Sequence, residues 1–386
     1  MDIGRLKKQY KRKSSYLINR IAAMVTGIEK KVVFESYSGR QYSDNPRFIS
    51  EKMHELFPDY KIIWGFQKET DLTKLGLPDY VECCRMGSWK YAVERASAFA
   101  LVRNEAMTGD LYKRPGQVFI QTWHGDRGFK KILYDSLKAR GVSEELFAYR
   151  DQTLTDLFVV GSDYAEKRIK TAFRYEEETL KTGCPRNDCL LHPDGIPTIK
   201  ERLGLRPDQK VLLYAPTLRR NSKVVHGTVD ISDTLDHLNR RGGDWICLVR
   251  AHPKSLGIDL MPGSDVIDVS AYPDMADLLM IADCLITDYS SCAGDYVLRK
   301  KPLLLAQFDL EQYMEEDRTF YVDINEIGYL IARTQEELNT YIDAYSDKQF
   351  AENCEAIMRY FGTHESGKAA ENVCHQINDR YLAIHS

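Results

Sequence analysis

The sequence predicts an α/β protein of two Rossmann-like domains that face each other across a cleft. Short apolar runs alternate with helical patterns, which is typical of a parallel sheet covered by helices on both faces. This alternation occurs twice along the chain. At 386 residues the chain is too long for one ordinary core, and it suits two domains of about 150–200 residues each.

Each domain is expected to contain one parallel sheet. Between the two halves, residues 192–197 combine proline, glycine and aspartate, and this turn chemistry predicts a hinge. The expected domains are therefore residues 32–192 and 198–375, followed by a tail at 376–386. Whether the last helices cross back to the first domain stays open. The expected strands are 31–36, 60–66, 98–102, 117–122 and 156–160, then 210–215, 245–250, 265–269, 284–287 and 302–306.

The net charge of -4 divides into a basic N-terminal arm and an acidic body. Residues 1–31 hold nine Lys or Arg against Asp2 and Glu29, a local charge of +7, which leaves -11 for the remainder. Apolar residues recur there at helical spacing, so a basic amphipathic helix is expected. Two interpretations stay open: a helix on an anionic membrane surface, or a helix packed on the first domain. The apolar positions are Leu17, Ile18, Ile21, Met24, Val25 and Ile28.

Composition disfavours several other classes of protein. Arg20 interrupts the apolar stretch and no small-residue cleavage pattern follows, which argues against a signal peptide. No run of about 20 apolar residues occurs, so the chain is not expected to span a bilayer. The nine cysteines lack the spacing of a zinc site or a disulfide framework, which favours a reducing cytoplasm. Neither a GxGxxG motif nor a P-loop is present. The overall composition and net charge do not indicate a protein that binds nucleic acid.

Polar and glycine residues follow five of the expected strands. Ligands of open parallel sheets bind beyond the carboxyl ends of the strands, so these segments are expected to meet at one site. Residues 35–39, after the first strand, are a further candidate for this site, on the side where a second substrate, the acceptor, would bind. The five segments are 123–127, 161–163 with 183–188, 216–220, 250–254, and 288–291 with Asp295 one turn later.

The residue types in these segments suit a phosphate diester or a diphosphate. Ser290 and Ser291 fall where a helix begins, so hydroxyls and free backbone N–H groups can face an anion. Arg186 and Arg250 offer forked donors that match phosphate oxygens. Residues 288–291 could equally be an ordinary helix cap, and this interpretation stays open.

Two histidines could exchange protons near neutral pH, which a hydroxyl nucleophile and a phosphoryl leaving group both require. They are His124 and His252, one in each expected domain. A single histidine at a strand end is more often structural, but two such residues in similar positions favour chemistry. Two basic pairs, Arg219 with Arg220 and Lys130 with Lys131, are expected to be solvated or to steer anions.

Taken in order, these segments resemble the CDP-glycerol glycerophosphotransferase family of teichoic acid synthesis. The resemblance runs from about residue 31 to residue 308 and beyond. It rests on the motifs FESYSG, QYSDNPR, TWHG, VVGSDY, GCPRND, LYAPTLR, RAHP and ITDYSSCAGDY. The set in this order is more specific than any one of its members.

The resemblance implies a GT-B-like, peripheral membrane enzyme at the cytoplasmic face of the cell membrane. Such an enzyme moves a polyol phosphate, glycerol phosphate by expectation, from a CDP-polyol to a hydroxyl of a lipid-linked acceptor and releases CMP. It implies that His124 is the general base and that His252 assists at the donor phosphates. No metal or other cofactor is assigned. It also implies that the CDP-polyol is held by Arg186, Pro216, Thr217, Arg250, Ser290, Ser291 and Asp295. Five neighbours of these motifs are further expected to bind substrate: Gly125, Asp126, Arg127, Gly128 and Ala251.

One departure from the family pattern concerns the loop after His124. The family commonly has HGTPLK, whereas this chain has HGDRGFK, so Asp126 and Arg127 replace a small and a rigid residue. The expected consequence is a change of polyol, such as ribitol, or of acceptor, such as a capsular glycan. Chain length favours a priming or single-addition enzyme. Two further hypotheses are a glycosyltransferase or epimerase that uses a UDP-sugar, and a catalytically silent membrane partner of a polymer-synthesising complex.

Overall fold

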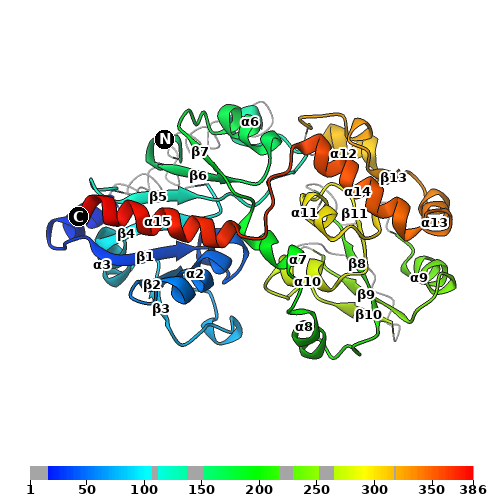
Figure 1. The fold of residues 1–386 in the computed structure, drawn as a ribbon, viewed down its shortest axis with the longest axis horizontal. Helices are drawn as coiled ribbons and strands as arrows, with labels where there is room; N and C mark the ends of the chain where they lie inside the picture. The colour runs from blue at the N-terminus through cyan, green and yellow to red at the C-terminus, as the bar shows by residue number, and fades with distance from the viewer. Residues whose placement is uncertain are drawn as a thin grey trace, which may run out of the picture.

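The computed structural model describes residues 16–106, 112–136, 151–217, 219, 229–251, 265–316 and 319–385. Two parallel sheets lie next to each other, each covered by helices, and Figure 1 shows them as the left and right halves of the molecule. The predicted α/β fold with two parallel-sheet domains is therefore confirmed.

The first sheet has seven strands in the order β3-β2-β1-β4-β5-β6-β7, and all its pairs are parallel. Its central strands are buried apolar runs, as expected for a sheet covered on both faces. The edge strands β3 and β7 are short, partly exposed and were not predicted. The bounds are β1 Glu29–Glu35, β2 Lys61–Phe66, β3 Val81–Arg85, β4 Ala98–Arg103, β5 Val118–Gln121, β6 Leu157–Val160 and β7 Thr179–Lys181.

The second sheet has six parallel strands in the order β10-β9-β8-β11-β12-β13. The five predicted strands of this half are all present, and β13 is an additional edge strand. The predicted hinge at 192–197 lies between two short helices, the second of which begins inside it. The bounds are β8 Lys210–Ala215, β9 Trp245–Val249, β10 Val266–Asp268, β11 Cys284–Thr287, β12 Leu303–Ala306 and β13 Leu330–Ala332.

Helices cover both sheets. Because their apolar faces point inwards, the buried cores are continuous from strand to helix on each side. Within the described ranges, no helix combines the length and the apolarity needed to cross a bilayer. The bounds are α2 Asp44–Leu56, α3 Trp89–Ser97, α6 Asp163–Ala172, α7 Asp188–Leu191, α8 Ile196–Arg202, α9 Ile231–Arg240, α10 Met275–Ile281, α11 Cys292–Tyr296, α12 Leu310–Glu316, α13 Gln335–Ala344, α14 Asp347–Phe361 and α15 Ala369–His385.

The C-terminal helix α15 crosses back to the first domain, where Figure 1 shows it in red along the first sheet. Val373, Cys374 and Ile377 are buried in the first core together with Ile49 and Met53 of α2. The predicted boundary at 375/376 therefore falls inside one helix, and the residues predicted as a tail belong to it. The expected second domain includes a segment that packs on the first.

The N-terminal segment is helical over residues 16–24. Ala22 is fully buried against Ala92 and Ala96 of α3, so the helix packs on the first domain through small side chains. The remainder of the predicted 1–31 helix differs: residues 29–31 belong to β1, and residues 1–15 lie outside the described ranges.

Candidate active site

A cavity of about 1170 Å³ lies between the two domains. Its walls are built by segments that follow strands of both sheets, as the strand-end argument predicted. Asp126 and Arg127 do not line the cavity, and His252 lies outside the described residues. The other predicted site residues line it: His124, Gly125, Gly128, Arg186, Pro216, Thr217, Arg250, Ala251, Ser290, Ser291 and Asp295.

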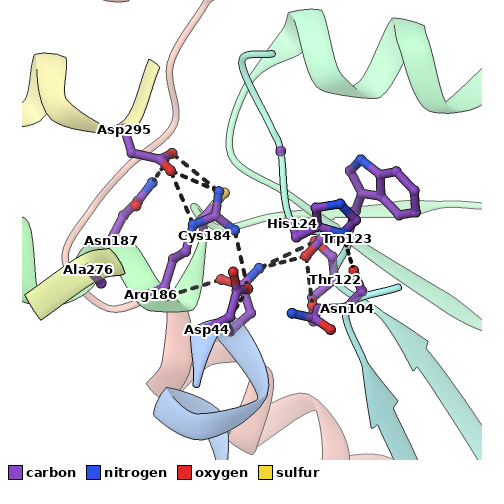
Figure 2. A network of polar contacts seen from close by, with 12 residues as sticks. Asp44, Asn104, Thr122, Trp123, His124, Cys184, Arg186, Asn187, Ala276 and Asp295 are labelled. Carbon is purple, nitrogen blue, oxygen red and sulfur yellow. Dashed lines mark hydrogen bonds and ion pairs between the residues drawn. The ribbon is translucent and has the colours of Figure 1, made fainter. Parts of the chain in front are cut away.

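His124 is held at the cavity wall by one hydrogen bond and two aromatic neighbours. Its Nδ1 lies 2.6 Å from the carbonyl oxygen of Asn104, and its ring lies against that of Trp123 (Figure 2). The ring of Tyr37 is its second aromatic neighbour. A carbonyl oxygen can only accept, so Nδ1 carries the hydrogen in this bond. In the neutral ring, Nε2 then keeps its lone pair, as a general base requires.

The loop after His124 packs directly on the start of α11. A Cβ at Gly128 would lie 3.1 Å from Cβ of Ser291, and one at Gly125 would lie 3.3 Å from Ser291 Oγ. Arg168 of α6 holds the other side of the loop, because it donates to the carbonyl oxygens of residues 125, 126 and 128. The two glycines therefore let the loop of the first domain approach Ser291 of the second.

Asp126 and Arg127 have partners inside the protein. Asp126 accepts hydrogen bonds from the amide of Gly161 and the hydroxyl of Ser162, each at 2.6 Å. Arg127 is fully buried, donates to the carbonyl oxygen of Gly294 at 2.6 Å, and pairs with Glu365 and Asp295. Both were predicted to bind substrate, but the structure places them in a buried network between the domains. Their charges are neutralised there by protein partners, so neither is available to a substrate.

Arg186 is also paired within the protein (Figure 2). Its guanidinium binds the carboxylate of Asp295, with the closest contact at 3.0 Å, and approaches Asp44 at 3.4 Å. Burial by itself lowers the pKa of Arg186, but Asp295 and Asp44 outweigh this effect and raise it. Arg186 and Asp295 line the cavity as a neutralised pair rather than as a free cation and a free anion.

Two donors in the second domain are left without partners at the cavity. Nη1 of Arg250 and Oγ1 of Thr217 are buried, and neither has a hydrogen-bond partner among the described residues. Buried polar groups are rarely left unsatisfied, so both atoms are suited to a ligand with acceptor oxygens. The Thr217 amide is itself bound by Asp288, which fixes the position of the threonine.

Arg219 differs from its expected solvated state. It is buried, pairs with Asp309 and Asp288, and its guanidinium lies 4.9 Å from the ring centres of both Tyr289 and Tyr313. This arrangement supports the wall of the cavity. Over the described residues, no three His, Cys, Asp or Glu side chains are placed so that they could hold a metal ion.

Sequence reasoning missed several residues that shape the site. Arg168, Asn45 and Asn104 act on loops far away in the chain, so no local spacing marked them. The motif QYSDNPR contains Asn45, and VVGSDY ends shortly before Arg168, but neither motif revealed the contacts of these residues. Tyr37, within the candidate segment 35–39, does line the cavity.

Two parallel-sheet domains with a polar cavity between their strand ends define a two-domain α/β protein. A family model described as CDP-Glycerol:Poly(glycerophosphate) glycerophosphotransferase matches residues 17–379, and the chain belongs to this family.

Curated relatives and a solved structure agree with this assignment. A teichoic acid poly(glycerol phosphate) polymerase of Staphylococcus epidermidis is 32% identical over 89% of this chain, and the chain spans 50% of that relative's length. A teichoic acid glycerol-phosphate transferase of Staphylococcus aureus is 32% identical over 90% of this chain and 92% of its own length. The structure of the wall teichoic acid polymerase TagF superposes with a TM-score of 0.84 at 27% identity, with full coverage of both chains.

Proposed function

We propose that this protein transfers glycerol phosphate from CDP-glycerol to a hydroxyl of a lipid-linked acceptor in teichoic acid or related cell-surface polymer synthesis, releasing CMP. Family membership supports the reaction class. The observation that carries the proposal is the shared cavity, which is lined by His124 and by the unpartnered donors of Arg250 and Thr217.

The proposed reaction is an in-line displacement at phosphorus. Nε2 of His124 takes the proton of the acceptor hydroxyl as its oxygen attacks the phosphorus that carries glycerol. A P–O bond to the acceptor forms, the P–O bond to CMP breaks, and CMP leaves. Arg250, Thr217 and Ser290 are suited to neutralise the charge that develops on the phosphate oxygens. His252, two residues after Arg250, is proposed to assist at the same phosphates.

The test is release of CMP from CDP-glycerol in the presence of a lipid-linked acceptor. His124→Asn is expected to lower the turnover number by about 100-fold or more, since a general base contributes at least that much. His375→Asn is the matched control, because this histidine lies on α15 outside the cavity. Full activity in the His124 variant would remove the base assignment.

The choice of donor is tested in the same assay. CDP-glycerol is expected to have a higher kcat/KM than CDP-ribitol or a UDP-sugar. The placement of Asp126 and Arg127 away from the cavity supports this, because neither side chain is available to select a different polyol. Preference for CDP-ribitol would favour the ribitol hypothesis, and activity on UDP-sugars alone would favour the glycosyltransferase or epimerase. If wild-type protein released no CMP from any CDP-polyol, the silent-partner hypothesis would replace this proposal.

We further propose a GT-B-like arrangement, in which the first domain presents the acceptor and the second binds the CDP-polyol. The base in the first domain and the unpartnered donors in the second support this division. Arg250→Lys is expected to raise the KM for CDP-glycerol more than it lowers kcat, because a lysine cannot reproduce the forked donor. Equal binding of CDP-glycerol by wild type and variant would contradict the assignment.

We also propose that the 16–24 helix contacts the cytoplasmic face of an anionic membrane, where a lipid-linked acceptor would be met. Ala22 faces the protein, whereas Leu17, Met24 and Val25 are more than half exposed. An exposed apolar face next to basic residues suits an interface with anionic lipid.

Co-sedimentation with phosphatidylglycerol vesicles tests this contact. Replacing Leu17, Ile21 and Met24 by serine is expected to weaken binding, because the apolar area available to the interface is lost. Replacing Met314 and Tyr360 by serine is the control, since these exposed apolar residues lie elsewhere. Unchanged binding of the N-terminal variant would place the membrane contact on another surface.

A further inference from the structure

Asn45 joins two loops of the cavity wall through one side chain. It lies in the first turn of α2 and is fully buried. Its Nδ2 donates to the carbonyl oxygen of Trp123 at 3.0 Å, and its Oδ1 accepts from the amide of Arg186, also at 3.0 Å. A carbonyl can only accept and an N–H can only donate, so both bonds agree on one orientation of the amide.

The contact with Trp123 acts on the residue next to the base. Trp123 has φ 50°, a left-handed conformation that is disfavoured for a residue with a Cβ. Its amide donates to Oε1 of Gln121 at 3.0 Å, and its carbonyl oxygen accepts from Asn45. These bonds stabilise the turn that directs His124 to its partner, the carbonyl oxygen of Asn104 (Figure 2).

The contact with Arg186 acts on the opposite wall. Arg186 pairs with Asp295 of the second domain, and its neighbour Asn187 also donates to that carboxylate. The start of α2 is itself bound to the second domain, because the amide of Asp44 donates to Asp274 at 3.0 Å. Asn45 is therefore fixed relative to both domains.

We propose that Asn45 is a positioning residue that couples the orientation of His124 to the Arg186–Asp295 wall. The proposal rests on the proposed function, in which His124 is the base. Asn45 does not touch the reacting atoms. It fixes the backbone next to His124 relative to the domain that is proposed to bind the donor.

Asn45→Asp separates the two contacts. The carboxylate can still accept from Arg186, but it faces the Trp123 carbonyl with an acceptor in place of a donor. The expected result is a fall in kcat of about 100-fold, as for a misplacement of a catalytic group by about 1 Å, while the Kd for CDP-glycerol measured by calorimetry stays unchanged. Asn45→Ser removes both contacts, so it is expected to lower kcat and to weaken donor binding as well.

Gln117→Glu is a matched control for the loss of a buried amide. Gln117 is buried, donates to the carbonyl oxygens of Arg95 and Ala98, and accepts from the amide of Arg114. It precedes β5, at the end opposite to His124, and does not line the cavity. This amide-to-acid change at Gln117 is expected to lower the Tm of the protein without lowering kcat per folded enzyme.

His124→Asn, measured alongside, keeps the two proposals apart. Loss of turnover in the Asn45→Asp and His124→Asn variants, with full turnover in Gln117→Glu, supports the positioning role. Wild-type turnover in Asn45→Asp beside an inactive His124→Asn would overturn it and leave the base in place. Wild-type turnover in His124→Asn would instead overturn the proposed function. If Asn45→Asp did not fold, wild-type kcat in Asn45→Ser would overturn the positioning role.

Discussion

Glu35 is a buried carboxylate at the end of β1, and its ionisation depends on neighbours from two other elements. Its Oε1 accepts from the hydroxyl of Tyr91, and its Oε2 lies 3.5 Å from Nη2 of Arg103. Burial by itself raises the pKa of Glu35, but the charges of Arg103 and Arg95 and the Tyr91 hydroxyl outweigh it, so the pKa lies below its ordinary value of 4.5. The ionised form is therefore the one that the fold stabilises.

This gives a prediction for stability against pH. A carboxylate whose pKa is lowered by folding contributes stability above its unfolded pKa and loses it as the pH falls through the folded pKa. Glu35→Gln is expected to reduce the free energy of unfolding by about 3 kcal/mol at pH 7, because buried arginines lose their counter-charge. The difference from wild type should shrink as the pH falls below 4.5. Urea unfolding at pH 7, 5 and 3.5 checks it, and a difference that is constant with pH would contradict it.

Single residues also show which parts of the site the sequence could predict. Ser290 and His124 each follow a strand, and the carboxyl ends of parallel strands meet at one edge of a sheet. Their positions directly after strands were therefore enough to predict that both line the cavity. Arg127 was assigned to the cavity because it belongs to the segment that follows the strand at 117–122. Its partners Glu365 and Asp295 lie 238 and 168 residues further along the chain, and no spacing within the HGDRGFK segment could reveal them.

At the scale of elements, the long buried strands were predictable from the sequence and the short edge strands were not. β4 and β8 each contain a continuous apolar run, whereas β7 has three residues, one of them an exposed lysine, and resembles a loop. The return of α15 to the first domain had no local signal either. Its pattern indicates only that one face is buried, and the partner of that face is set by the loop at 362–368.

Asp188 of α7 caps α15 and so fixes its start. Its carboxylate accepts from the amides of Ala369 and Ala370, at 2.9 and 2.8 Å. Asp188→Ala is expected to reduce the free energy of unfolding by about 1–2 kcal/mol, because two helix N-terminal donors lose their acceptor. Asp379→Ala, in the exposed middle of the same helix, is expected to have little effect. Amide hydrogen exchange should show α15 opening first in the Asp188 variant, and equal protection in both variants would contradict the capping role.

For the whole molecule, the relative position of the domains is set where the 125–128 loop meets α11. Arg127 is buried there between carboxylates of α11 and of the segment that leads to α15. Burial by itself lowers the pKa of Arg127, but Glu365, Asp126 and Asp295 raise it, so the residue stays charged. Two copies of the alternating pattern predicted two domains. The closeness of their contact follows instead from glycine at 294, where a Cβ would lie 2.5 Å from Cβ of Arg127.

Gly294→Ala tests whether this contact sets the geometry of catalysis. Alanine is favoured over glycine inside a helix by about 1 kcal/mol, so a local effect would be stabilising. The added methyl group instead meets the Cβ and backbone of Arg127, which cannot move aside as a flexible side-chain end could. The expected net result is a loss of about 1–3 kcal/mol in unfolding free energy from overpacking. A fall of about tenfold in kcat is also expected, because the loop that carries His124 must shift away from Ser291.

Gly27→Ala is the control, since a Cβ there meets nothing within 4 Å. Urea unfolding and CMP release measure the two effects, and a stabilised Gly294 variant with wild-type turnover would show that the domain contact is looser than the structure requires.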